Sequence, residues 1–221
     1  MSDDSFFREV NEEIRQDRAR ALWDRFGSLI IGVAVAVVVG TGAYVAWEYW
    51  SENRANAAGD SFASALTLAN AGQNDEALQA LGEIERDGYG AYPLLARMRS
   101  ATVLFEKGDA QGAIAGFDAV STDNSAPASI RDMARLRAAL ILVDHGSFAD
   151  VSSRAEALTA DTNPMRHAAR EVLGLSAWKE GKAQDALALF EQIRSDGSAP
   201  PNARQRATIM VDLLRGSGAA S

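Results

Sequence analysis

Two stretches of the chain, residues 101–117 (ATVLFEKGDAQGAIAGF) and residues 174–190 (GLSAWKEGKAQDALALF), share one pattern. Each begins with a small residue, reaches a Gly seven positions later, and has an Ala and a Phe five and nine positions beyond that Gly. Small residues let two antiparallel helices approach closely, and a Gly accommodates the left-handed backbone of the turn between them. Each stretch therefore predicts a helical hairpin.

The pattern recurs four times along the chain, at intervals of 36, 38 and 35 residues. The turn glycines are Gly72, Gly108, Gly146 and Gly181. The third copy departs from the pattern, because Val151 and Ala155 replace its Ala and its aromatic residue. Breaks between copies fall at Asp87 with Gly88, Pro127, Asn163 with Pro164, and Pro200 with Pro201. Since proline suits a helix start and not a helix interior, these breaks separate four predicted hairpins.

The repeats predict an all-α domain over residues 57–215, an α-solenoid of about four hairpins. A last helix, at about 202–214, is expected to cover the open end of the stack, as terminal repeats require. Residues 216–221 are expected to form a disordered tail.

Residues 26–47 carry no charged side chain and are dominated by Val and Ala. A helix of about 21 residues spans the roughly 30 Å hydrocarbon core of a bilayer. Aromatic residues, which favour membrane interfaces, bracket the segment at Trp23, Phe26, Tyr44 and Trp47. The sequence predicts a transmembrane helix at 27–47, after a charged leader (1–26) and before a connector (48–56). A buried helix of a soluble core is the alternative.

The predicted orientation follows from the arginines. Five precede the span, at positions 8, 15, 18, 20 and 25, whereas only Arg54 lies in the twenty residues after Trp47. Because Lys and Arg stay on the cytoplasmic side, the N-terminus is predicted to be cytoplasmic. A cleaved signal peptide is the rival interpretation, since residues 55–57 read Ala-Asn-Ala. The long charged leader and the aromatic end of the apolar run favour an uncleaved anchor.

Two further features of this region allow a functional and a plain interpretation. Gly32, Ala36 and Gly40 form a row of small residues that suits packing against another membrane helix, although such a row arises easily in a segment rich in small residues. Phe7, Val10 and Ile14 share one helix face in the leader. That face suits a cytosolic partner or the lipid headgroups, and a solvated helix without a specific partner is the alternative.

The composition and motifs argue against a catalytic, metal-binding or nucleic-acid-binding function. The chain has no Cys, 22 Lys plus Arg against 30 Asp plus Glu, and no basic stripe that would neutralise nucleic-acid phosphates. Its two histidines, His145 and His167, lack a neighbouring metal-binding or catalytic motif, and no nucleophile elbow or phosphate-binding loop occurs. We expect no enzyme activity, no cofactor or metal, no nucleic-acid partner and no small-molecule substrate.

The repeats resemble the tetratricopeptide repeat in their period, in the small residue seven before the turn glycine and in the aromatic residue nine after it. They depart from it twelve positions after the glycine, where Ile, Val or Leu replaces the family's small residue. The resemblance implies that the first helix of each hairpin lines a concave, partner-binding face. Transferred by offset from each glycine, that face contains Leu95, Met98, Thr102, Phe105, Glu106, Met133, Leu136, Leu140, Val143, Asp144, Ala168, Glu171, Leu175, Trp178 and Lys179.

Within this face the predicted partner-binding residues are Met98, Phe105, Met133, Leu140 and Trp178. Met and aromatic side chains suit adaptable contacts with varied partners. The alternative is that these residues pack against neighbouring helices or against the C-terminal helix.

The whole chain resembles the bacterial YfgM-like family, an ancillary subunit of the SecYEG translocon. The resemblance is carried by FFREVNEEIRQDRARALWDRFG at residues 6–27, by WEYW at residues 47–50 and by the repeats that follow. It implies a single-pass bacterial inner-membrane protein with a cytoplasmic N-terminus. Its repeats would lie in the periplasm beside the translocon and a membrane-anchored chaperone.

The predicted function is therefore a tethered protein–protein interaction scaffold linking the Sec translocon to periplasmic chaperones. A scaffold of the same architecture for envelope assembly or division is the alternative. A membrane-bound enzyme or cofactor protein is a third hypothesis, which predicts a deep polar pocket with converging ionisable groups. The sequence leaves open the partner, the face that binds it, the oligomeric state and any cytosolic partner of the leader.

Overall fold

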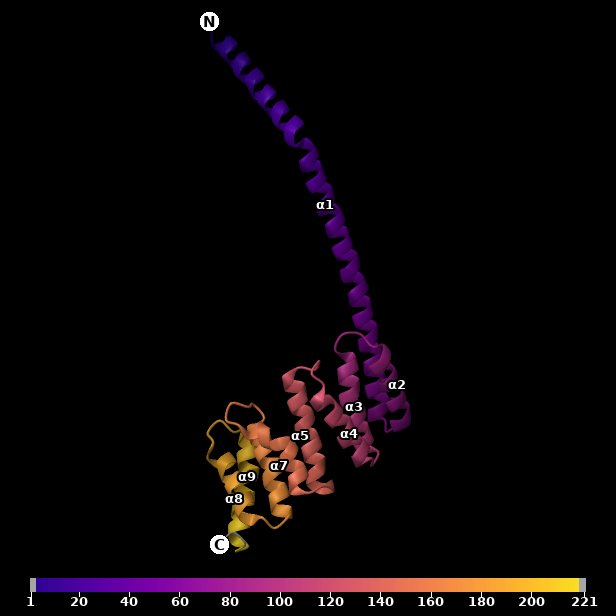
Figure 1. The fold of residues 1–221 in the computed structure, drawn as a ribbon, viewed down its shortest axis with the longest axis vertical. Helices are drawn as coiled ribbons and strands as arrows, with labels where there is room; N and C mark the ends of the chain where they lie inside the picture. The colour runs from indigo at the N-terminus through magenta and orange to yellow at the C-terminus, as the bar shows by residue number, and fades with distance from the viewer. Residues whose placement is uncertain (1–2, 219–221) are drawn as a thin grey trace. The chain divides into compact units, whose positions relative to one another are not determined.

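The computed structural model describes residues 3–218, and within that range every regular element is a helix (Figure 1). The predicted all-α class is confirmed. Side-chain positions are described at Arg20 and from Trp23 onward, except at Ile30. The side chains of Phe7, Val10 and Ile14, which would form the leader face, are therefore not described, and the end of the predicted tail, residues 219–221, lies outside the described residues.

Four hairpins and a last helix follow one another in chain order (Figure 1). The end of α1 pairs with α2, α3 with α4, α5 with α6, and α7 with α8, and α9 follows. Their bounds are α1 Asp3–Asn70, α2 Asn74–Asp87, α3 Tyr92–Glu106, α4 Ala110–Thr122, α5 Ala128–His145, α6 Phe148–Ala155, the 3₁₀-helix η1 Glu156–Thr159, α7 Arg166–Lys179, α8 Ala183–Ser195 and α9 Pro201–Gly216. Gly216, expected in the tail, thus still belongs to α9.

The chain divides into two compact units, residues 1–56 and residues 57–221. In the first unit α1 contains one stretch, within Trp23–Asn70, that is long and apolar enough to cross a membrane. Its Val side chains are exposed, and apart from the adjoining residues and backbone of α1 itself no described atom lies within 4 Å of a Cβ built on Gly32 or Gly40. Ala36 is exposed as well. The proposed packing of this row against another helix stays a prediction.

The core of the second unit is built from the repeated positions. Leu81, Phe117 and Phe190, nine residues after their turn glycines, are fully buried, as are Val120, Leu158 and Ile193 at position twelve. The small residues let the helices meet: a Cβ built on Gly174 would lie 2.9 Å from Cε2 of Phe190. Apolar residues at period-matched positions therefore fill the seam within each hairpin.

Ion pairs join one hairpin to the next, and the last hairpin to α9, at sequence separations close to the repeat period. The Arg154 guanidinium on α6 donates to both carboxylate oxygens of Asp118 on α4, at 2.9 and 2.6 Å. Arg206 on α9 does the same to Glu171 on α7, at 2.5 and 2.7 Å. Bidentate geometry of this kind fixes relative orientation better than a single hydrogen bond.

The turns are of two kinds. Gly72, Gly108 and Gly181 have φ of 75°, 94° and 76°, the left-handed backbone predicted for them. The prediction is wrong for Gly146, whose φ is −141° and ψ −170°.

The physical reason lies in the helix ends beside Gly146. Helix α5 continues to His145, and Ser147 begins α6 with a capping box. In this box the Ser147 backbone N–H donates to Asp150 and the Asp150 backbone N–H donates to the Ser147 hydroxyl. These contacts satisfy the first donors of α6 with an extended chain, so no left-handed residue is needed.

Candidate protein-binding site

A groove of about 290 Å³ opens on the first helices of three successive hairpins. Its lining residues are Thr102 and Phe105 of α3, Phe117 of α4, Arg137, Leu140, Ile141, Val143 and Asp144 of α5, and Leu175 of α7. Six of these nine are positions that the repeat geometry assigns to the concave face. The groove is therefore the place where the structure brings predicted concave-face residues together.

Helical periodicity explains how α5 supplies most of this groove. Arg137, Ile141 and Asp144 recur at i, i+4 and i+7, so their side chains point to one face of the helix. Leu140 stands beside them. Ile141 and Phe117 are buried and form the floor, whereas Phe105 and Leu140 remain 43% and 55% exposed. The groove thus has a fixed apolar floor and two accessible apolar walls.

The remaining predicted binding residues lie elsewhere. Met98 is partly buried and packs against the core cluster that contains Ala101 and Phe117. Met133 and Trp178 are exposed, but neither lines the groove. Of the five residues predicted to bind a partner, the structure therefore places Phe105 and Leu140 in the groove. Binding by any of the five stays a prediction.

The charged side chains around the groove differ in whether they have a hydrogen-bond or ion-pair partner. The Lys179 ammonium donates to the carbonyl oxygens of Val143 and Asp144, at 2.8 and 3.0 Å, and lies 3.4 Å from the Asp144 carboxylate. Arg137 makes no hydrogen bond or ion pair with any side chain that the structure describes. At the edge of the groove the His145 ring meets the Phe105 ring edge-on, with centroids 6.2 Å apart.

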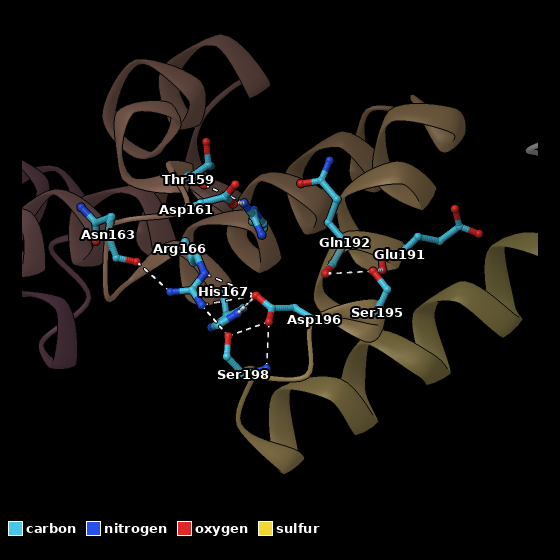
Figure 2. Close-up of polar contacts among 11 residues, drawn as sticks. Thr159, Asp161, Asn163, Arg166, His167, Glu191, Gln192, Ser195, Asp196 and Ser198 are labelled. Carbon is cyan, nitrogen blue, oxygen red and sulfur yellow. Dashed lines mark hydrogen bonds and ion pairs between the residues drawn. The ribbon is translucent and has the colours of Figure 1, made fainter.

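A second cluster of polar residues lies between η1, α7 and the loop after α8 (Figure 2). Asp196 accepts hydrogen bonds from the Ser198 hydroxyl and backbone N–H, at 2.6 and 2.8 Å. Its other carboxylate oxygen lies 2.7 Å from Nε2 of His167, a residue only 7% exposed, and 3.3 Å from the Arg166 guanidinium. The hydrogen bonds from Ser198 and His167 hold the pKa of Asp196 well below its ordinary value.

This arrangement is not that of a hydrolase. In a serine nucleophile site the hydroxyl donates to the imidazole, whereas the Ser198 hydroxyl donates to the carboxylate. Within the described residues, no group of three His, Asp or Glu side chains is placed to hold a metal ion. The cluster secures the loop before α9 and leaves no activated nucleophile.

Sequence reasoning missed the pairing of His167 with Asp196, because the two residues are 29 positions apart. A repeated sequence motif, DNSAP at 123–127 and DGSAP at 196–200, could have indicated that these two loops have the same structure. Asp123 accepts the same two hydrogen bonds, here from Ser125, and forms an ion pair of 2.8 Å with Arg97; these contacts lower its pKa to about 2. Each copy of the motif therefore encodes a loop whose Asp is anchored to the first helix of the preceding hairpin.

Taken together, the stacked hairpins, the terminal helix and the open groove define a helical-repeat protein. A family model described as a tetratricopeptide repeat-like domain matches residues 20–192. The chain belongs to this tetratricopeptide repeat-like family. The match includes the apolar segment as well as the hairpins. No curated protein and no solved structure matches the chain.

Proposed function

We propose that the chain is a membrane-anchored scaffold that binds other proteins through the first helices of its hairpins. The observation that carries this proposal is the groove, which exposes Phe105 and Leu140 over a buried apolar floor. Accessible apolar side chains on a rigid support are typical of protein-binding surfaces. The family supports the same function, since tetratricopeptide-like folds are typically non-catalytic scaffolds.

The apolar stretch of α1 is proposed to anchor the chain in the bacterial inner membrane, with the hairpins in the periplasm. Its exposed Val side chains suit lipid, and α1 satisfies its own backbone hydrogen bonds. The Arg54 guanidinium lies 4.4 Å from the Trp50 ring centroid, so a cation covers an aromatic residue just beyond the proposed span. The arginines of the leader favour a cytoplasmic N-terminus.

The partners proposed are the SecYEG translocon and a membrane-anchored periplasmic chaperone. This part of the proposal is supported by the resemblance to the YfgM-like family in residues 6–27 and 47–50. A scaffold for envelope assembly or division is the competing hypothesis. Exchanging residues 27–47 for an unrelated span separates the two hypotheses, because association through this helix would be lost and an envelope role through the hairpins would persist.

Photo-crosslinking in cells tests the binding function. A crosslinking amino acid at Phe105 or Trp178 is expected to capture a translocon subunit, a periplasmic chaperone or a secreted polypeptide. Matched controls are Gln79 on α2 and Ala188 on α8, which are exposed on second helices. Capture at all four positions alike, or at none, would contradict a binding surface on the first helices.

A further inference from the structure

We propose that the groove lined by Phe105, Leu140 and Arg137 binds polypeptide segments in which an aliphatic or aromatic side chain adjoins a carboxylate. This inference rests on the proposed scaffold function and adds the chemistry of the partner. It has two physical parts, an apolar binding surface and an exposed cation beside it that has no ion-pair partner among the described residues.

The apolar binding surface exists because α3 and α5, the first helices of two successive hairpins, are not packed directly against each other. Helix α5 packs closely against α4 and α7, but no comparable packing joins α5 to α3. Phe117 and Ile141 form the floor of the space between α3 and α5, and both are closely packed in the buried core. An inserted Leu or Phe side chain would cover the exposed faces of Phe105 and Leu140.

The cation beside this apolar binding surface is Arg137. Arg137 and Asp144 are the two charged residues among the nine that line the groove. The Asp144 carboxylate already faces Lys179, which also takes up the last carbonyl oxygens of α5. Glu106, next to Phe105, pairs with Arg99 at 3.4 Å. Arg137 is therefore a groove-lining cation that forms no ion pair with any carboxylate that the structure describes.

The chemistry of this cation selects the ligand. A guanidinium is planar and presents parallel N–H donors that match a carboxylate in a bidentate way. An apolar ligand without an acidic group would remove water from the Arg137 guanidinium and provide no replacement hydrogen bond, which costs desolvation free energy. An acidic residue next to the apolar anchor avoids that cost, whereas a basic residue there adds repulsion.

Fluorescence anisotropy with the full chain in lipid nanodiscs tests this specificity. The probes are short fluorescein-labelled peptides in a Gly/Ser background that differ only at their centre: Leu-Phe-Asp, Leu-Phe-Asn, Leu-Phe-Lys and Ser-Ser-Asp. We expect the Asp peptide to bind roughly twofold to fivefold tighter than the Asn peptide, as for an exposed charge pair. The Lys peptide should bind more weakly still, and loss of the apolar pair should cost about tenfold or more.

Charge variants of the protein assign the preference to Arg137. Arg137→Gln should bind the Asp and Asn peptides equally, and Arg137→Glu should prefer the Lys peptide, with melting temperatures close to that of the unmodified chain. Leu140→Ser should weaken all three apolar peptides together. Arg204, a half-buried arginine on α9 that does not line the groove, provides the control, because Arg204→Gln should keep the preference for the Asp peptide.

The outcomes distinguish this inference from the scaffold proposal. Equal binding of the Asp and Asn peptides, a preference that survives Arg137→Gln, or no detectable binding of the Asp peptide would overturn the inference. Crosslinks at Phe105 in cells would then still support the scaffold with a partner of other chemistry. Loss of the crosslinks while the peptide preference holds would instead contradict the cellular scaffold function alone.

Discussion

At the residue scale, the two helices of a hairpin pack most closely where one of them has a glycine. Gly174 lies in α7 directly against the Phe190 ring of α8, and Gly116 lies against Ala101 in the second hairpin. Both glycines occupy helix interiors, where Gly costs conformational entropy relative to Ala. Their presence there has a packing reason, because a larger residue would separate the two helices.

Gly174→Ala is expected to destabilise the chain by about 1 kcal/mol. Overpacking a filled core costs about 1–3 kcal/mol, and the better helix propensity of Ala returns part of it. The matched control is Gly82→Ala in α2, where the nearest atom, in the flexible Arg86 side chain, lies 4.0 Å from the added Cβ. The control should be neutral or slightly stabilising in thermal melts of the full chain. A raised melting temperature for Gly174→Ala would show that Phe190 can move aside.

The anchored Asp residues of the two repeated loops make stability depend on pH. The pKa of Asp196 lies below its ordinary value, and that of Asp123 is lowered to about 2, mainly by hydrogen bonds from Ser198 and Ser125. A group with a lowered folded-state pKa stabilises the fold above its unfolded-state pKa and loses that contribution as pH falls. The window therefore runs from about pH 4, where an ordinary Asp titrates, down to about pH 2 and below.

The double variant Asp123→Asn/Asp196→Asn is expected to melt at a lower temperature than the unmodified chain at pH 7. Between pH 4 and pH 2 it should lose less further stability, because the two linked carboxylates are gone. Ser198→Ala removes the largest cause of the lowered Asp196 pKa. Its loss of stability between pH 4 and pH 2 should therefore be intermediate between that of the unmodified chain and that of the double variant. Equal acid sensitivity of all three proteins in circular dichroism melts would contradict the assigned linkage.

At the element scale, α9 closes the stack with one apolar stripe. Ala203, Ala207, Val211 and Leu214 are buried against Phe190 and Ile193 of α8, whereas Leu213 lies outside this stripe and is exposed. The spacing of the buried residues is that of one helix face. The stripe makes the terminal helix part of the core, although it belongs to no hairpin.

Leu214→Ala is expected to lower the free energy of unfolding by about 2–4 kcal/mol, since it leaves a cavity at a residue only 1% exposed. The neighbouring Leu213→Ala is the matched control, because Leu213 is 48% exposed, and should change stability by about 0.5 kcal/mol or less. Urea unfolding measures both. Similar effects of the two substitutions would mean that α9 does not pack on α8 through this stripe.

The hairpins could be predicted because their information is local. Period, turn glycines and prolines all act within a few residues, so the elements follow from short-range rules. The Gly146 turn was mispredicted, because the alternative cap by Ser147 and Asp150 competes with a left-handed Gly and the sequence does not show which one forms. The groove was only partly predictable, because the separation of α3 from α5 results from packing over the whole stack. His167 and Asp196 meet for the same long-range reason.

At the scale of the whole molecule, the proposed function requires the two units of the chain to occupy different environments. The residues around 27–47 would lie in lipid, and the acidic hairpin domain would lie in water. The family match spans both, which argues that the apolar segment belongs to the domain as the family defines it. A removable targeting signal would not be expected inside such a match, so retention of the segment is the central assumption to test.

The absence of cysteine makes that test clean, because a single introduced Cys is the one thiol in the chain. Ser195→Cys, at the exposed end of α8, is expected to react with a membrane-impermeant maleimide in intact spheroplasts. Ser5→Cys, in the leader, should react after the inner membrane is opened. Both substitutions leave the charges that set orientation unchanged.

The two labelling patterns and the mass of the intact protein decide between the competing topologies. An uncleaved anchor with a cytoplasmic N-terminus gives the full-length mass together with protected Ser5→Cys. A protein that begins near residue 58 would instead have lost the segment as a signal peptide, and its hairpins would be free in the periplasm. Labelling of Ser5→Cys but not Ser195→Cys in intact spheroplasts would place the hairpins in the cytosol. The groove would then face cytosolic partners, which excludes the periplasmic part of the proposed function and leaves the predicted peptide chemistry intact.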